Sequence, residues 1–192
     1  MTIQGSHGRP CAHALLLAGL FVLATLFATG TCGAERAPAA YVTQLIPGAQ
    51  TVGTGRLTWL GFHAYDAALY AGNARYEDGK PFALGLTYAR KFKGAAIAER
   101  SISEIRKLGL GQDQELAQWQ VTLGNIFPDI APGDQLTGVS LGGGALRFFH
   151  NGRAIGTVND EGLRHAFFSI WLDPRTSAPE LRRKLLGDTG AK

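Results

Sequence analysis

The sequence predicts an α+β protein in which a layer of helices packs on one face of an antiparallel β-sheet. Predicted strands and helices occur in separate runs along the chain, which is typical of α+β folds. The later strands are separated by glycine-containing turns, as in antiparallel hairpins. Each long helical segment carries one apolar face, which has to be buried against another layer.

The first 34 residues have the layout of a secretory signal peptide. A short polar start is followed by an apolar or near-apolar run, Ala14–Ala28, and then by small residues. This run is shorter than the roughly 20 residues that a bilayer-spanning helix needs. We therefore expect cleavage after Ala34, with Ala28 as the second choice, and a periplasmic or secreted protein with no stable membrane span after cleavage. Acylation at Cys32 and an uncleaved membrane anchor are the alternatives.

Cleavage after Ala34 would leave 158 of the 192 residues and neither of the two cysteines, Cys11 and Cys32. That length suffices for one domain with a hydrophobic core, which we place at residues 51–187 after a loose lead-in at 35–50. The full chain has 19 Lys and Arg against 15 Asp and Glu. This modest excess is scattered along the chain, so nucleic acid is not an expected partner.

The predicted strands fall into two groups of three. The first group is rich in aromatic and branched residues and begins with a hairpin around Gly61. The second group is a meander with turns at Gly142–Gly144 and at Asn151–Gly152, a pair that favours a two-residue hairpin turn. The strands are expected at Arg56–Leu60, Phe62–Tyr70, Phe82–Ala89, Gln135–Leu141, Ala145–His150 and Arg153–Val158.

Four helices are expected between and after these strand groups, where the apolar period changes. Gly109 and Pro128 end the first two helices, and Asp160 is a plausible N-cap of the third. Ser177 and Glu180 have the spacing of a capping box at the start of the last helix. The helices are expected at Ile97–Leu108, Gln114–Phe127, Leu163–Leu172 and Pro179–Leu186.

No sequence motif for a metal or a cofactor is present. The chain lacks a phosphate-binding loop, an HExxH motif and a GxSxG nucleophile elbow. After cleavage the histidines would be His63, His150 and His165, which have no close ligand spacing. Asp129 and Asp134 could act as an acid–base pair, but beside prolines and a glycine they are more typical of turns. We expect neither a metal nor a cofactor.

Arg56 leads into a segment that is otherwise mostly apolar and aromatic, "RLTWLGFHAYDAALYAG". The residues leave two interpretations open. Arg56 is a strand-end arginine in a surface ion pair, or it is the cation that meets an anionic or carbonyl-bearing ligand. The large aromatic residues here and further on are expected to be core first, with some of them able to line a cleft: Trp59, Phe62, Tyr88, Phe167, Phe168 and Trp171.

Four stretches resemble the chalcone isomerase-like proteins, specifically their exported bacterial branch: "GRLTWLGFHAYDAALYAG", "IFPDIAPGDQLTGVSL", "RFFHNGRAIGTVND" and "AFFSIWLDPRTSAPELRRKLLG". The resemblance covers nearly all of residues 50–187. It implies a large antiparallel sheet, a layer of helices on one face, and a cleft between them. The family includes enzymes that close a flavanone ring from a chalcone, and non-catalytic members that bind fatty acids in the same cleft.

The resemblance also implies roles for three residues. By position, Arg56 corresponds to the arginine that stabilises a phenolate in the enzymes and pairs with a carboxylate in the fatty-acid binders. Tyr65 corresponds by position to a residue of the family that supplies a hydroxyl to the site. Ser169 corresponds to a second such residue, through a gapped alignment. Three further enzyme positions, a tyrosine, a lysine and an asparagine in the family enzymes, are here Lys93, Ala96 and Arg100.

These departures favour a non-catalytic protein, because the missing tyrosine would donate to developing carbonyl charge. The leading hypothesis is an exported protein that binds a fatty acid or a similar apolar carboxylate through Arg56, Tyr65 and Ser169. The alternative is an isomerase or intramolecular lyase acting on an enone- or chalcone-like substrate, with Arg56 and Tyr65 as catalytic residues. A structural partner with a filled cleft is the third class.

Overall fold

The computed structural model describes residues 37–188. The predicted signal peptide and its cleavage site therefore lie outside the described residues. Within them the chain forms helices and strands close to those predicted. In chain order these elements are α1 (Ala40–Leu45), β1 (Ala49–Trp59), β2 (Phe62–Gly72), β3 (Phe82–Tyr88), α2 (Gly94–Lys107), α3 (Asp113–Ile126), β4 (Gln135–Ser140), β5 (Ala145–His150), β6 (Arg153–Asn159), α4 (Glu161–Leu172) and α5 (Pro179–Leu185).

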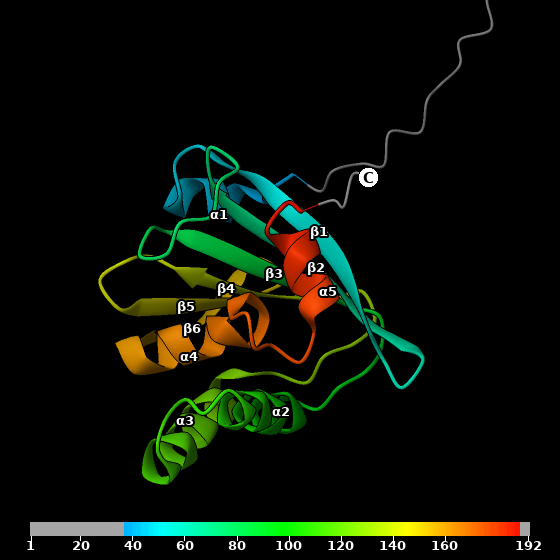
Figure 1. The fold of residues 1–192 in the computed structure, drawn as a ribbon, viewed down its shortest axis with the longest axis vertical. Helices are drawn as coiled ribbons and strands as arrows, with labels where there is room; N and C mark the ends of the chain where they lie inside the picture. The colour runs from blue at the N-terminus through cyan, green and yellow to red at the C-terminus, as the bar shows by residue number, and fades with distance from the viewer. Residues whose placement is uncertain (1–36, 189–192) are drawn as a thin grey trace, which may run out of the picture. The chain divides into compact units, whose positions relative to one another are not determined.

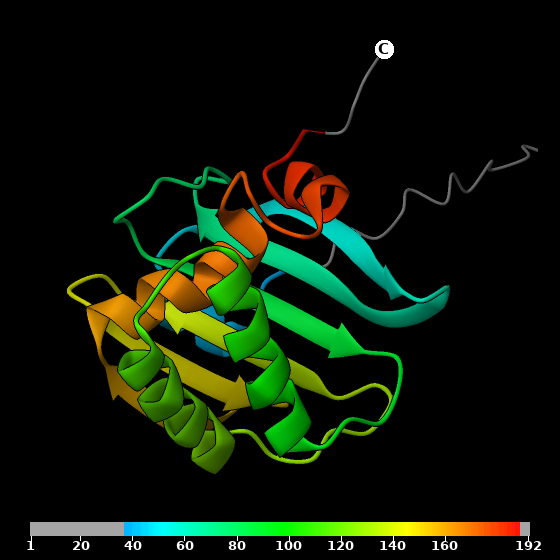
Figure 2. The same cartoon turned by 60° about the horizontal axis from the view of Figure 1, so that its bottom comes forward.

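The six strands form one antiparallel sheet, and their order in space follows their order in the chain, from β1 to β6. Helices α2 to α5 cover one face of this sheet (Figures 1 and 2). The arrangement confirms the predicted α+β class with an open antiparallel sheet.

The main hydrophobic core lies between the sheet and the helices α2 to α5. Strands β2, β3 and β5 contribute inward-facing side chains such as Leu69, Leu84 and Phe148, and helix α4 contributes Phe167 and Phe168. Several of the aromatic rings meet edge to face; Phe82 and Phe168, for example, have centroids 4.5 Å apart. The packing fixes the orientation of α4 against the sheet.

A second, smaller core lies on the opposite face of the sheet. A loose lead-in is predicted at residues 35–50, but α1 and the start of β1 occupy part of this segment. Val42 and Ile46 are buried against Tyr70, Val139 and Phe149. A helix of six residues is too short to show a clear apolar period, so its sequence gives little indication of its structure.

Helix caps agree with the prediction at α4 and differ at α5. The Asp160 side chain accepts a hydrogen bond from the Leu163 N–H at 2.9 Å, as expected of an N-cap. The capping box predicted from Ser177 to Glu180 does not form. The Ser177 hydroxyl instead donates to the Glu104 carboxylate at 2.6 Å, which joins the start of α5 to α2.

Helix α5 lies directly against strand β1 because two glycines of the strand face it. A Cβ atom at Gly53 would collide with the Lys184 carbonyl, and one at Gly55 would lie 2.6 Å from Leu181 Cδ1. Gly53 and Gly55 therefore face the helix layer, while Thr54 between them faces the other side of the sheet.

Candidate functional site

Arg56 lies on the face of the sheet opposite to the helix layer. It is directly across from Asp66 in the β1–β2 register, and its Nε donates to Asp66 Oδ1 at 2.9 Å. The Arg56 side chain is 61% exposed. Burial raises the pKa of Asp66, but hydrogen bonds and charges from Arg56 and His63 outweigh this and lower it. In this structure Arg56 is part of a surface ion pair.

Tyr65 lies on the other face of the same hairpin. It is paired with Leu57, one residue along β1 from Arg56, and the side chains of neighbouring strand residues point to opposite faces. The Tyr65 hydroxyl accepts a hydrogen bond from Trp171 Nε1 at 2.9 Å. Burial raises the pKa of Tyr65 to about 12, despite the hydrogen bond from Trp171. The structure therefore does not bring Arg56 and Tyr65 together.

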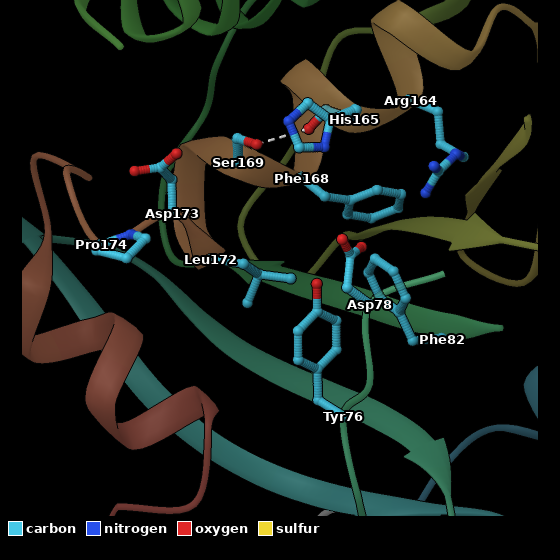
Figure 3. Close-up of a pocket in the computed structure, with 10 residues that line it drawn as sticks. All are labelled: Tyr76, Asp78, Phe82, Arg164, His165, Phe168, Ser169, Leu172, Asp173 and Pro174. Carbon is cyan, nitrogen blue, oxygen red and sulfur yellow. Dashed lines mark hydrogen bonds between the residues drawn. The ribbon is translucent and has the colours of Figure 1, made fainter. Parts of the chain in front are cut away.

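Ser169 lines a cavity of about 200 Å³ at one end of the sheet (Figure 3). Neither Arg56 nor Tyr65 is among the residues that line it. Its walls are formed by helix α4, the start of β3, and the loop between β2 and β3. Residues at its rim are exposed to solvent. The lining residues are Tyr76, Asp78, Phe82, Arg164, His165, Phe168, Ser169, Leu172, Asp173 and Pro174.

The walls of this cavity are held by aromatic packing. Phe82 meets both Tyr76 and Phe168 edge to face, with centroid distances of 5.0 and 4.5 Å. The Ser169 hydroxyl donates to the His165 carbonyl at 2.8 Å, so its oxygen can still accept a hydrogen bond. The cavity therefore combines aromatic walls with a similar share of polar and charged side chains.

Arg164 is the buried charge of the cavity. The residue is 9% exposed and lies in the first turn of α4. Its Nη1 donates to Ser140 Oγ at 3.3 Å, and its Nη2 lies 3.7 Å from the carboxylate of Glu161, which is itself 79% exposed. The Arg164 Nε is buried without a partner among the described residues. A buried guanidinium needs stronger compensation than this.

Two carboxylates also line the cavity, and both have partners. Arg175 donates from Nε and Nη2 to the Asp173 carboxylate, at 3.0 and 2.8 Å. These hydrogen bonds lower the pKa of Asp173 to about 2. Asp78 is exposed at the rim and accepts from the Gly79 N–H at 3.0 Å. One acid is paired and the other is solvated. Arg164 is therefore the charged group of the cavity that an anionic ligand would stabilise most.

Sequence reasoning missed Arg164, although its position carries a usable indication. The residue stands within "LRHAFFSIWL", where nearly every neighbour is apolar and α4 buries most of its side chains. An arginine on such a helix is rarely fully buried unless it is paired. A cation inside a helix that is apolar on nearly all sides is therefore a candidate ligand contact.

Among residues 37–188 no group of three or more His, Cys, Asp or Glu side chains is placed to hold a metal ion. None of the helices in this part has the length and apolar character to cross a bilayer.

Comparisons with known proteins agree with this fold. The profile of the family described as chalcone isomerase-like matches residues 52–187. The crystal structure of a fatty-acid binding protein from Arabidopsis thaliana has a TM-score of 0.55 and 14% sequence identity to this chain. The match covers 74% of this chain and 88% of the plant protein. Curated proteins give no match to the sequence.

Proposed function

Because this chain belongs to the chalcone isomerase-like family, we propose that it is a non-catalytic protein that binds a fatty acid or a similar apolar carboxylate. The observation that carries the proposal is the poorly compensated Arg164 in a cavity with aromatic walls. The plant protein of the same fold, described as a fatty-acid binding protein, supports the ligand class.

In this proposal the carboxylate of the ligand pairs with the Arg164 guanidinium. Charge-assisted hydrogen bonds of this kind are stronger than neutral ones. The Ser169 hydroxyl lines the same cavity, and Phe82, Phe168 and Leu172 supply apolar surface for the first carbons of the chain. Typical ligand sites measure roughly 300–1,000 Å³. A cavity of about 200 Å³ therefore takes the head group and the start of the chain, and the rest extends past the rim.

Of the three residues predicted from the family resemblance, Ser169 is retained in this site. Arg56 and Tyr65 lie on opposite faces of the sheet, so the two side chains do not converge in this structure. The isomerase alternative needs the same cation and hydroxyl to face one substrate, and we do not propose it. Under the binding proposal Arg164, rather than Arg56, is the head-group cation.

The proposal is tested by titrating the full chain with a fluorescent fatty acid, comparing wild type with Arg164→Met and Arg56→Met. Methionine keeps an unbranched side chain in both variants and removes the charge. We expect Arg164→Met to weaken binding at least about tenfold, as loss of a charged hydrogen bond implies. Arg56→Met should bind like wild type.

Thermal unfolding of each variant shows whether it folds. Equal affinity of folded Arg164→Met and wild type would overturn the assignment of Arg164. If only Arg56→Met weakens fatty-acid binding, then Arg56 is the head-group cation, as the family resemblance implies. If the wild type does not bind and carries no fatty acid after denaturing extraction and mass spectrometry, the binding function itself is refuted.

We also propose that the protein is exported and cleaved after Ala34. The proposal rests on the polar start, the apolar run and the small residues that follow it. Mass spectrometry of the protein recovered from the periplasm or the medium tests it. A mature chain beginning at Glu35 is expected, and an intact Met1 on an intracellular protein would refute export.

A further inference from the structure

The tip of the β1–β2 hairpin exposes three large apolar side chains. Trp59, Leu60 and Phe62 are 51%, 76% and 56% exposed. Trp59 and Phe62 are predicted to be core residues, and this prediction is wrong for both. The hairpin carries them past the other strands of the sheet (Figures 1 and 2). We name residues 59–62 the hairpin tip.

The turn itself does not need an apolar residue. Leu60 and Gly61 have φ angles of 49° and 79°, as in a two-residue turn of type I′. Asparagine, aspartate and glycine are the residues that this turn favours, and a leucine at positive φ is strained. A polar residue at position 60 would fit the backbone better and would expose less apolar surface to water. The turn therefore does not explain the leucine.

Cationic side chains stand directly behind the hairpin tip. The Arg90 guanidinium lies 4.6 Å from the centroid of the Phe62 ring, and that of Arg100 lies 5.4 Å from the Trp59 ring. Lys91 is exposed beside Arg90. Among the described residues neither Arg90 nor Lys91 forms an ion pair, whereas Glu104 lies 2.7 Å from Arg100.

Acidic side chains nearby do not cancel this charge. Asp66 is engaged by Arg56 and His63, and Glu104 by Arg100 and Lys107. Glu99 is exposed on α2, next to Arg100 in the chain. The uncompensated positive charge near the tip therefore comes chiefly from Arg90 and Lys91.

From this arrangement we propose that the hairpin tip docks onto a lipid bilayer that contains anionic lipids. Trp and Phe side chains favour the interface between water and hydrocarbon, and basic residues behind them meet anionic head groups. A protein partner fits less well, because a stable interface buries about 800 Å² on each side and a convex two-residue turn offers a small area. This inference is independent of the cavity, which lies at the opposite end of β2.

The test uses the full chain with a site-specific readout, because the apolar run at residues 14–28 can itself bind lipid. An environment-sensitive fluorophore is attached to Leu60→Cys in a background of Cys11→Ser and Cys32→Ser. The matched control carries the same label on Val121→Cys, since Val121 is an apolar residue of α3 with 64% exposure. Both are titrated with vesicles of phosphatidylcholine alone or mixed with phosphatidylglycerol.

With the mixed vesicles, we expect the label at position 60 to brighten at least about twofold and to be quenched by lipids brominated on their acyl chains. The label at position 121 should stay in water. Charge reversal of Arg90 and Lys91 to glutamate should weaken the titration at least about tenfold. If the label at position 60 stays in water with every vesicle composition, the proposal is overturned. The hairpin tip would then be assigned to a protein partner. An equal response to neutral vesicles would refute the requirement for anionic lipid.

Discussion

The two ends of strand β2 use the same kinds of side chain in opposite ways. At the hairpin tip, aromatic rings are exposed and cations flank them. At the other end, beside the loop that follows β2, a cation is buried and aromatic rings wall the cavity around it. Burial and available partners, rather than residue type, therefore decide which arginine or phenylalanine is a functional candidate.

The largest expected effect comes from truncating one phenylalanine at each end. Phe168 is 3% exposed and packs on Phe82, so Phe168→Ala should lower the free energy of unfolding by about 3–5 kcal/mol. Phe62 is 56% exposed, so Phe62→Ala should cost about 1 kcal/mol or less. Urea denaturation measures both values. Similar losses in the two variants would show that the hairpin tip is structural.

Glu104 is the next test, because its carboxylate pairs with Arg100, which lies over the Trp59 ring of the hairpin tip, and also joins α2 to Ser177 before α5. Burial raises the pKa of Glu104, but hydrogen bonds from Lys107 and Ser177 and the charge of Arg100 outweigh this and hold it below the ordinary value of 4.5. A lowered pKa contributes stability above pH 4.5 that is lost as the pH falls through the folded-state pKa.

Glu104→Gln should therefore lower the free energy of unfolding by about 1–2 kcal/mol at pH 7, with a smaller difference from wild type at acidic pH. Denaturation midpoints measured from neutral pH to below the ordinary glutamate pKa give this difference. If the two proteins keep a constant difference over that range, the ionised form of Glu104 is not the stabilising one.

Leu60→Asn should raise stability and weaken membrane docking. Asparagine tolerates the φ of 49°, so the free energy of unfolding should increase by about 0.5–1 kcal/mol. Loss of the exposed leucine should weaken vesicle binding in the same variant. Gly61→Ala serves as the control, since its φ of 79° makes alanine destabilising. A Leu60→Asn variant less stable than wild type would contradict the assigned turn.

The smallest effect is expected for Arg56→Met. The Arg56–Asp66 pair is exposed, so its loss should change the free energy of unfolding by no more than about 0.5 kcal/mol. The pKa of Asp66 should rise, because the hydrogen bond from Arg56 is one of the interactions that lower it. Carboxyl NMR titration follows that pKa. An unchanged value would mean that the ion pair is absent in solution.

Much of the fold could be predicted because its determinants are local. Asn151 and Gly152 have positive φ angles and connect β5 to β6, and Asp160 caps α4, both as their residue types indicate. Helix α1 and the missing capping box at Ser177 could not be predicted in the same way. Val42 and Ser177 take their conformations from distant partners, the sheet and Glu104, which no local pattern contains.

The candidate site was harder to predict than the fold. Arg56 attracts attention because it is conspicuous in the sequence, yet strand register turns it to the face away from the helices. Its neighbour Leu57 points toward them, so a shift of one residue along β1 would exchange the two roles. Ser169 could be placed through the family resemblance. Arg164 becomes a candidate only when its exposure and its partners are known.

The order of the strands has a consequence for how the chain folds. Each strand pairs with its neighbour in the sequence, so β1–β3 and β4–β6 are two three-stranded meanders. Within the sheet they are joined by the pairing of β3 with β4, and the connection between those strands contains α2 and α3. Closing a long loop is slower than zipping a hairpin. We therefore expect the pairing of β3 with β4 to be the late step of folding. The rate of this step should depend on how early α2 and α3 pack against the sheet.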